Sequence, residues 1–349
     1  MAIHSQIFMI ANYLDIIAAV LSAFFNAVLI FLILTRSPVQ FGTYKYLMIF
    51  ISIFEIVMAI MEAILIPIHY SHGSAVAVMV NITNTPFSPF TVKILLLFTL
   101  GLFGASLAIF AVHFIYRFLA VSGSPYIKTF DSWKLFFWFL LPFSSGMAWP
   151  VTAHFLCTPD QEAHEFFREG ILRDFGDDVE NFDYRLFWLY KRLENGEIQY
   201  QKDSLVAIAI ASFTVGFSLF IILLFGFKCY YHITSLMKKS TNTSYQFRIL
   251  QSQLFYALVV QTLIPVLFVH APTAIMFLLA FLEVDLGNYV TIVSMSIALY
   301  SVMDPLPNFV IIKPYRTALF DYFHCRKPVD YQSSLNRWSG APTATPPKI

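Results

Sequence analysis

Several carboxyl and amide side chains stand within long, mainly apolar runs, among them Asp15, Asn26, Glu55, Glu62 and Asp304. A carboxyl or amide group in an apolar surrounding is costly unless it finds a partner. Such a group can take up a proton, bind a cation or hold helices together. These residues therefore predict a protonatable or ion-sensitive switch, with hydrogen bonding between helices as the structural alternative.

Spacing places these groups on shared faces, because residues seven or eleven apart lie on one side of an α-helix. Glu55 and Glu62 are seven apart, and Asp15 and Asn26 are eleven apart. Counting the helical rise from the ends of the apolar runs puts Asn26, Glu55 and Asp304 within about 8 Å of one another in depth. We expect these three residues to form one polar network.

The elements that carry these groups are predicted to be membrane-spanning helices. Hydrophobic residues make up 58% of the 349 residues and charged residues only 12%, a balance that a soluble domain does not need. Seven runs can cross the roughly 30 Å hydrocarbon core of a lipid bilayer. They cover residues 10–34, 46–68, 94–116, 135–156, 204–227, 254–281 and 289–312. The sequence predicts an all-α membrane protein, a seven-helix bundle over residues 10–316.

The third run, 94–116, suits the centre of the bundle. One face carries the small residues Gly101, Gly104, Ala105, Ala108 and Ala111, so that neighbouring helices can approach it closely. The run ends at Tyr116 and Arg117, where hydrocarbon should give way to headgroups.

Other chemistries find little support. Zinc-ligand spacing, a phosphate loop and a nucleophile elbow are absent, so we expect no metal, no cofactor and no enzymatic activity. The net charge of +1 gives no basic excess for nucleic acid.

The distribution of Lys and Arg predicts the orientation. Fifteen of the 22 fall in the segments that share a side with the C-terminus, which places residues 1–9 outside the cell and the tail in the cytosol. The inverted orientation is the alternative. Of the two glycosylation sequons, Asn81 is then predicted to carry a glycan and Asn242 is not.

Two segments outside the spans have helical patterns. In the large outer loop, 157–203, apolar residues recur at helical spacing over 179–193, which predicts a short amphipathic helix lying over the bundle. After the last span, Tyr315, Leu319 and Phe320 form an apolar stripe that predicts an interfacial helix over 315–325, with Cys325 palmitoylated. Residues 326–349 are predicted to be a disordered cytoplasmic tail.

The sixth run contains two prolines, Pro265 and Pro272, which lie on one face. Each removes a backbone hydrogen bond, so the helix should kink there, either for packing or as a pivot for motion. His270 lies between them and is either a ligand contact or a satisfied core residue.

Four motifs at span ends carry a family resemblance. They are YKYLM at 44–48, HFIYRF at 113–118, QSQLFYALVVQTLIP at 251–265 and DPLPNFVIIKPYR at 304–316. In this order they resemble the nematode serpentine chemoreceptors of the Str superfamily, with the subfamilies str, srj and srh left open. The similarity runs from the first span to Arg316.

The resemblance implies a rhodopsin-like G-protein-coupled receptor: an olfactory-type sensor in the plasma membrane, on the cilium of a chemosensory neuron. Its implied partners are a heterotrimeric G protein and a small-molecule odorant. Asn26 and Arg117 match the first-span asparagine and third-span arginine of rhodopsin-like receptors. Asp304-Pro305 resembles their seventh-span Asn-Pro pair.

The sequence also departs from the rhodopsin-like pattern. Tyr116 stands where an acid usually precedes the arginine, which puts a local salt bridge to Arg117 in doubt. No Trp precedes Pro265. Cys157 has no cysteine partner at the top of the third span, so the outer loop must be held by other contacts or be mobile.

The expected mechanism is capture of an apolar or volatile ligand in the outer half of the bundle, followed by opening of its cytoplasmic end. Depth and residue type select the ligand-binding candidates Glu62, Phe103, Trp149, His270, Thr273 and Ser294. The candidate G-protein contacts are Tyr116, Arg117, Lys238, Lys239, Arg248 and Arg316, with plain positive-inside charge as the alternative.

The alternative from another class is a ligand-gated channel or secondary transporter whose path is lined by Asp15, Glu55, Glu62 and Asp304. Transporters usually contain paired repeats with matching broken helices. Here no matching half is found.

Overall fold

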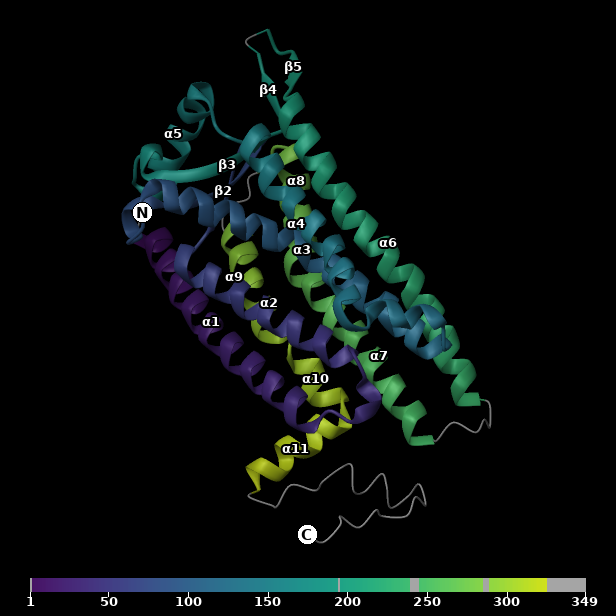
Figure 1. Cartoon of the computed structure of the whole chain (residues 1–349). Helices are drawn as coiled ribbons and strands as arrows, with labels where there is room; N and C mark the ends of the chain where they lie inside the picture. The colour runs from purple at the N-terminus through teal and green to yellow at the C-terminus, as the bar shows by residue number, and fades with distance from the viewer. Residues whose placement is uncertain (1, 194, 239–244, 285–288, 325–349) are drawn as a thin grey trace, which may run out of the picture.

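The computed structural model describes residues 2–193, 195–238, 245–284 and 289–324. Within them, six helices or continuous helix pairs are long and apolar enough to cross a membrane. Residues 292–311, which meet the following helix at a bend of 95°, make the seventh crossing. The crossings are α1 (Ala2–Arg36), α2 (Tyr44–Leu65), α3 (Pro89–Ser122), α4 (Leu135–Leu156), α6 (Lys202–Lys238), α7 with α8 (Tyr245–Pro265 and Ala271–Phe281), and α9 with α10 (Tyr289–Met303 and Leu306–Ile311). The predicted seven-helix fold is confirmed (Figure 1).

The two ends of the bundle differ. The start of α1 lies at the end that carries the strands and α5 (Gln161–Phe175), whereas α11 (Lys313–Phe323) lies at the opposite end (Figure 1). A turn of 95° separates the last crossing from α11, in the segment where an interfacial helix is expected. Arg36 donates a 2.8 Å hydrogen bond to the Tyr322 hydroxyl, which fastens α11 to the inner end of α1.

Helix α3 occupies the centre and packs against α2, α4, α6 and α7. Gly101, Gly104 and Ala105 of its small-residue face meet α4; the sequence predicts a close approach on this face but does not identify the neighbouring helix. A Cβ atom added to Gly104 would lie 2.5 Å from the Trp149 ring, and one added to Gly146 would lie 2.9 Å from the Gly101 carbonyl oxygen. The two backbones approach closely at Gly101 and Gly146, and the missing side chain of Gly104 leaves room for the Trp149 ring.

An antiparallel sheet covers the outer end, in the order β1 (Ile68–His72), β2 (Ala75–Asn81) and β3 (Phe182–Trp188). A separate hairpin joins β4 (Tyr190–Arg192) to β5 (Ile198–Tyr200). Short 3-10 turns lie at Val39–Phe41, Ile82–Asn84, Pro125–Phe130, Ser132–Lys134 and Val179–Asn181.

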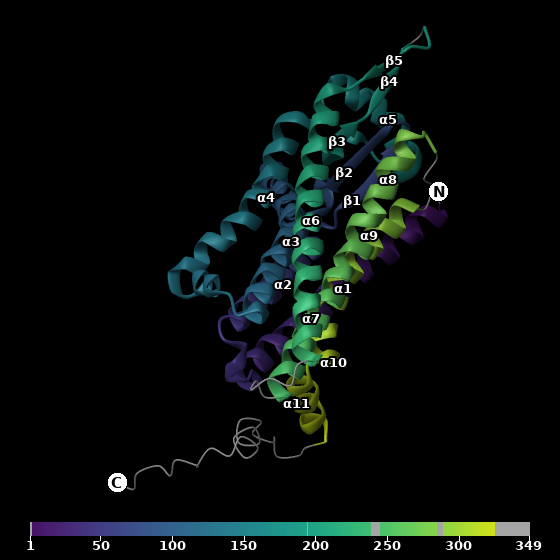
Figure 2. The same ribbon diagram turned by 90° about the vertical axis from the view of Figure 1, so that its right-hand side faces the viewer.

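The amphipathic helix predicted over 179–193 is therefore wrong. Tyr184, Leu186 and Trp188 alternate along β3 and pack in one cluster with residues of α5. Helix α5 is the helix that this loop does contain, and it lies at the same end of the bundle as β3 (Figure 2). The first outer connection supplies the neighbouring strand, with Ala75 opposite Trp188 and Asn81 opposite Phe182. This pairing overrides the local helical spacing, since a strand needs only alternating burial.

The sixth crossing contains a π-helical turn, Val266–His270, between Pro265 and Pro272. Proline has no backbone N–H to donate, and a π turn changes the helical hydrogen-bond pattern locally so that the neighbouring backbone groups can still be paired. Residues 245–281 thus remain one span, with an irregular turn in the outer half.

Candidate functional site

A cavity of about 310 Å³ lies in the outer half of the bundle. Its walls come from α3, α4, α6, the π turn and α8. Of the six ligand-binding candidates, Phe103, Trp149, His270 and Thr273 line it. Depth and residue type thus selected four residues that the fold brings together.

The outer sheet forms the ceiling of this cavity. Side chains alternate along its strands: Ala75, Ala77 and Met79 face α5, whereas Val76 and Val78 face the cavity. Pro67 and His69, at β1, and Phe187, on β3, complete the ceiling. The sequence interpretation missed these residues because pairing between distant strands puts them there.

Glu62 and Ser294 do not line the cavity, so these two assignments are corrected. Glu62 is buried on the side of α2 that faces α1, where its carboxyl group interacts electrostatically with that of Asp15. The Ser294 hydroxyl lies 3.1 Å from Nδ1 of His69, so it forms a hydrogen bond with a residue that lines the cavity without lining the cavity itself. Burial lowers the pKa of His69 to about 4, which keeps its imidazole uncharged at neutral pH.

The hydroxyl groups of the lining are largely satisfied within the protein. Thr99, Thr152 and Thr273 each donate to the carbonyl oxygen four residues earlier, at 3.0, 2.6 and 2.7 Å. The Trp149 indole donates to Thr214 at 3.0 Å, which bridges α4 and α6. The His270 Nε2 atom lies 3.3 Å from the Ser106 hydroxyl on α3. With their hydrogen bonds made internally, these groups present a mainly apolar surface.

Two of the three predicted network residues come together. Glu55 accepts a short hydrogen bond from Tyr300, and Asp304 accepts one from Gln261, which in turn accepts from Asn308 at 3.2 Å. The carboxyl groups of Glu55 and Asp304 also interact electrostatically.

Asn26 stands apart from this network, which corrects the sequence expectation. Its amide donates to the Ser22 carbonyl oxygen one turn earlier on α1, at 3.1 Å. Depth alone could not show this separation, because the rotational setting of α1 decides which side chains Asn26 reaches.

Arg117 is buried, with 2% of its surface exposed, rather than extended to the headgroups. Its Nη2 donates to the carbonyl oxygen of Gln251 at 3.0 Å and to the side-chain oxygen at 2.6 Å. The guanidinium also lies over the Tyr44 ring, 5.0 Å from the centroid. The Tyr116 ring is stacked on the same Tyr44 ring, with 5.3 Å between the two ring centroids. In this conformation Arg117 and Tyr116 face the bundle interior, and their contact with a G protein stays a prediction.

The other proposed cytoplasmic contacts lie on the surface or near it. Lys238 and Arg316 are exposed. Arg248 is partly buried and donates to the Leu236 carbonyl oxygen at 3.0 Å, which ties α7 to α6. Lys239 lies outside the described residues, as do Cys325 and Asn242.

The outer loop is held without a disulfide to Cys157. This cysteine is buried with a free thiol whose pKa burial raises to about 12. Its carbonyl oxygen accepts a 2.8 Å bond from Leu186, so the end of α4 is fastened to β3. Asn81 closes β2, and its amide donates to Asp177 at 3.0 Å. The sheet performs the anchoring role.

Comparison with known proteins agrees with this geometry. Residues 11–320 match the family described as "Serpentine type 7TM GPCR chemoreceptor Str". The chain is 30% identical over 306 residues to G-protein coupled receptor str-217 of Caenorhabditis elegans, covering 88% of each. It is 32% identical over 335 residues to Serpentine receptor class r-10 of Caenorhabditis briggsae, covering 95% of this chain and 96% of that protein.

Among solved structures, the crystal structure of squid rhodopsin has a TM-score of 0.61 with this fold at 12% identity. The alignment covers 98% of this chain and 93% of that one. At this identity the likeness concerns the fold alone.

Proposed function

Because the chain belongs to the Str family of serpentine seven-transmembrane G-protein-coupled chemoreceptors, we propose that its outer cavity binds a small, uncharged, mainly apolar ligand. The observation that carries this proposal is the cavity itself, which has the size of a small-molecule site and a mainly apolar lining. We propose further that binding activates a heterotrimeric G protein, as in olfactory-type sensing at a ciliary plasma membrane.

The charge of the lining favours an uncharged ligand. Among the described residues around the cavity, none is Asp, Glu, Lys or Arg. Its ceiling imidazole, His69, is uncharged at neutral pH because burial lowers its pKa. An ionic ligand would lose its hydration without gaining a counter-ion, which is costly.

One helix links the cavity to the cytoplasmic end. His270 lies in the π turn of the sixth crossing and lines the cavity. Further along the same crossing, Gln261 bonds Asp304 and Gln251 bonds Arg117. A ligand that fits better when the π turn shifts would therefore favour movement of α7 and release of Arg117.

The direct test measures nucleotide exchange on an added heterotrimeric G protein by the purified receptor in vesicles. We expect small uncharged volatile compounds to accelerate exchange, and ionised analogues of similar size to be inactive. Ala207→Phe, which projects into the cavity, should raise the half-maximal concentration about tenfold or more, because the added ring competes for the same space. Val206→Phe is the matched control, since Val206 is exposed on the outer side of α6.

The alternative function predicts another result. Ionic current or ligand uptake by the reconstituted chain alone, without nucleotide exchange, would favour a channel or transporter. Surface expression of each variant separates loss of ligand response from misfolding.

A further inference from the structure

The water-facing end of the cavity is closed by the outer sheet. The β2–β3 ladder is continuous from the Ala75–Trp188 pair to the Asn81–Phe182 pair. Above it, Phe167 and Ile171 of α5 are fully buried against the strands. A ligand arriving from water would have to separate this sheet from the helices below.

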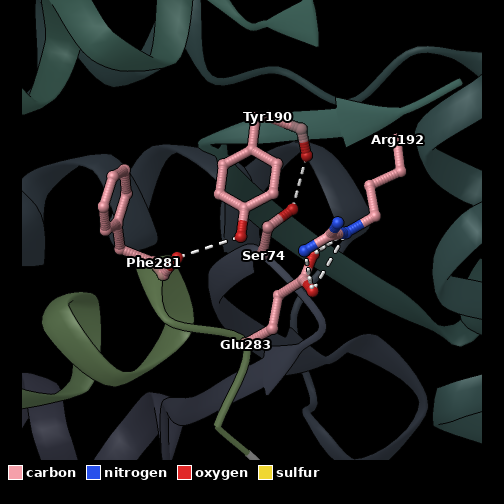
Figure 3. Close-up of polar contacts among 5 residues, drawn as sticks. All are labelled: Ser74, Tyr190, Arg192, Phe281 and Glu283. Atoms are coloured by element: carbon pink, nitrogen blue, oxygen red, sulfur yellow. Dashed lines mark hydrogen bonds and ion pairs between the residues drawn. The ribbon is translucent and has the colours of Figure 1, made fainter. Parts of the chain in front are cut away.

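Strand β4 links the turn between β1 and β2 to the outer end of α8 (Figure 3). The Tyr190 hydroxyl donates to the Phe281 carbonyl oxygen at 2.9 Å, and the Tyr190 carbonyl oxygen accepts a short bond from Ser74. Arg192 donates to both carboxylate oxygens of Glu283, at 2.7 to 3.1 Å. These contacts hold the ceiling to the outer end of α8.

The side of the cavity is different. Among its lining residues, Ser212 on α6 and Ala274 on α8 are exposed on the outer surface of the bundle. Both side chains are small, and each touches the cavity from one of two separate helices. Both residues lie within membrane-crossing helices, so we expect the surface around them to face lipid rather than water.

Larger side chains lie on both sides of the seam between α6 and α8, where Ser212 and Ala274 stand. Towards the outer end, Ile208 and Phe277 each pack against the buried cluster that contains Met276. Val215 and Phe268 belong to the next cluster towards the cytoplasm. On its opposite edge, α6 is joined to α4 by the hydrogen bond between Trp149 and Thr214. The open wall is thus confined to the pair Ser212 and Ala274.

We infer that the ligand reaches the cavity from the bilayer, through a lateral opening between Ser212 and Ala274, and is therefore a compound that partitions into membranes. This inference rests on the proposed ligand-binding role of the cavity. It accounts for a site that is closed towards water and apolar within, because apolar solutes concentrate in the hydrocarbon. It also assigns the Tyr190 and Arg192 contacts to keeping the ceiling shut.

The test places a reporter thiol inside the cavity. Thr99 is a buried lining residue whose hydroxyl bonds only its own helix, so Thr99→Cys is a conservative change. The probes are N-phenylmaleimide, which enters bilayers, and a sulfonated maleimide, which stays in water. Asn195→Cys, on the exposed turn between β4 and β5, calibrates both reagents, and the unsubstituted receptor gives the background.

After calibration, we expect N-phenylmaleimide to modify Thr99→Cys at least about tenfold faster than the sulfonated reagent does. Adding Ala274→Trp, or Ser212→Trp from the other helix, should slow this modification about tenfold. Ile275→Trp is the matched control, because Ile275 is exposed beside Ala274 but does not line the cavity. Tyr190→Phe with Arg192→Gln should leave the N-phenylmaleimide rate unchanged.

Equal calibrated rates for the two reagents, no slowing by either tryptophan, or a thiol inert to both would overturn the lateral route. So would a faster N-phenylmaleimide reaction after the ceiling contacts are removed. Labelling needs no G protein. A receptor that labels as expected yet never drives nucleotide exchange would refute the proposed function while leaving the route intact.

Discussion

The guanidinium of Arg117 on α3 donates to both the main-chain and the side-chain oxygen of Gln251 on α7. Rhodopsin-like receptors usually place an acid before this arginine, whereas here that position is Tyr116. The acceptor comes instead from another helix, so the contact ties the third crossing to the sixth at their cytoplasmic ends. Hydrogen bonds to a charged group contribute roughly 1.5–3 kcal/mol each, enough to bias two helix arrangements.

Gln251→Ala should raise basal nucleotide exchange. The substitution removes the side-chain acceptor but leaves the main-chain one, so about one charge-assisted bond is lost from the closed arrangement. A loss of about 1.4 kcal/mol shifts the equilibrium roughly tenfold towards the open form. The measurement is exchange on an added G protein without ligand. Gln246→Ala, at an exposed position on α7, should leave the basal rate unchanged, and an unaltered rate in Gln251→Ala would show that the contact does not restrain the receptor.

Arg117→Lys separates a restraining role from a signalling role. If Arg117 only restrains α7, lysine should raise basal exchange, as Gln251→Ala does. If the opened receptor also uses this side chain to bind carbonyl groups of an inserted G-protein segment, a compact ammonium cannot replace the planar fork of five donors. We predict the second result: normal surface expression and ligand binding, with exchange lowered about ten- to a hundredfold. Ligand-driven exchange at the wild-type level would refute the G-protein contact.

The seven crossings could be predicted because lipid requires long apolar runs. Their orientation stays a prediction, made from the asymmetry of Lys and Arg between the loops. The outer sheet could not be predicted. Residues 75–81 are a short apolar run without a decisive period, and the apolar positions over 179–193 fit a helix as well as a strand. Gly73, at φ +53°, is the local sign of the hairpin turn. Only pairing between the two outer connections decides the structure.

Within the site, the depth of each residue in the bundle could be predicted from the sequence, but the direction in which its side chain points could not. Phe103 and Trp149 line the cavity, whereas Glu62, at a similar depth, faces α1. The rotation of each helix about its axis depends on packing that the sequence of one helix does not specify. For the same reason Glu55 meets Tyr300, while Asn26 bonds its own helix.

Asn81 is predicted to carry the glycan. It ends β2 on the outer sheet, and Thr83 of the sequon donates to its side-chain oxygen at 2.6 Å. A glycosidase-sensitive shift in mobility should disappear in Asn81→Gln and in Thr83→Ala, and should persist in Asn242→Gln. Two variants are used because Asn81 also caps the following turn, so Gln alone could reduce expression. A shift abolished only by Asn242→Gln would contradict the orientation.

His69 should make the outer ceiling less stable in acid. Burial lowers its pKa to about 4, against an ordinary value near 6.5, because the imidazolium would lose its hydration beneath the sheet. When the ceiling unfolds, His69 becomes exposed and binds a proton at higher pH than the folded form does. The free energy of unfolding of the ceiling therefore keeps its full value above about pH 6.5 as far as His69 is concerned, and it falls as the pH drops towards 4. The total loss from this residue is about 3 kcal/mol.

The measurement compares thermal unfolding of the receptor with that of His69→Asn between pH 7.5 and 4. Asparagine can keep the hydrogen bond that Nδ1 makes with Ser294 but cannot titrate in this range. The melting temperature of the wild type should fall more steeply with acid than that of His69→Asn, and the difference between the two curves isolates this residue from the other histidines. His154→Gln, at an exposed position on α4, should follow the wild-type curve. Parallel curves for wild type and His69→Asn would mean that the ceiling admits enough water to hydrate the charged ring, which would also contradict a cavity closed towards the aqueous side.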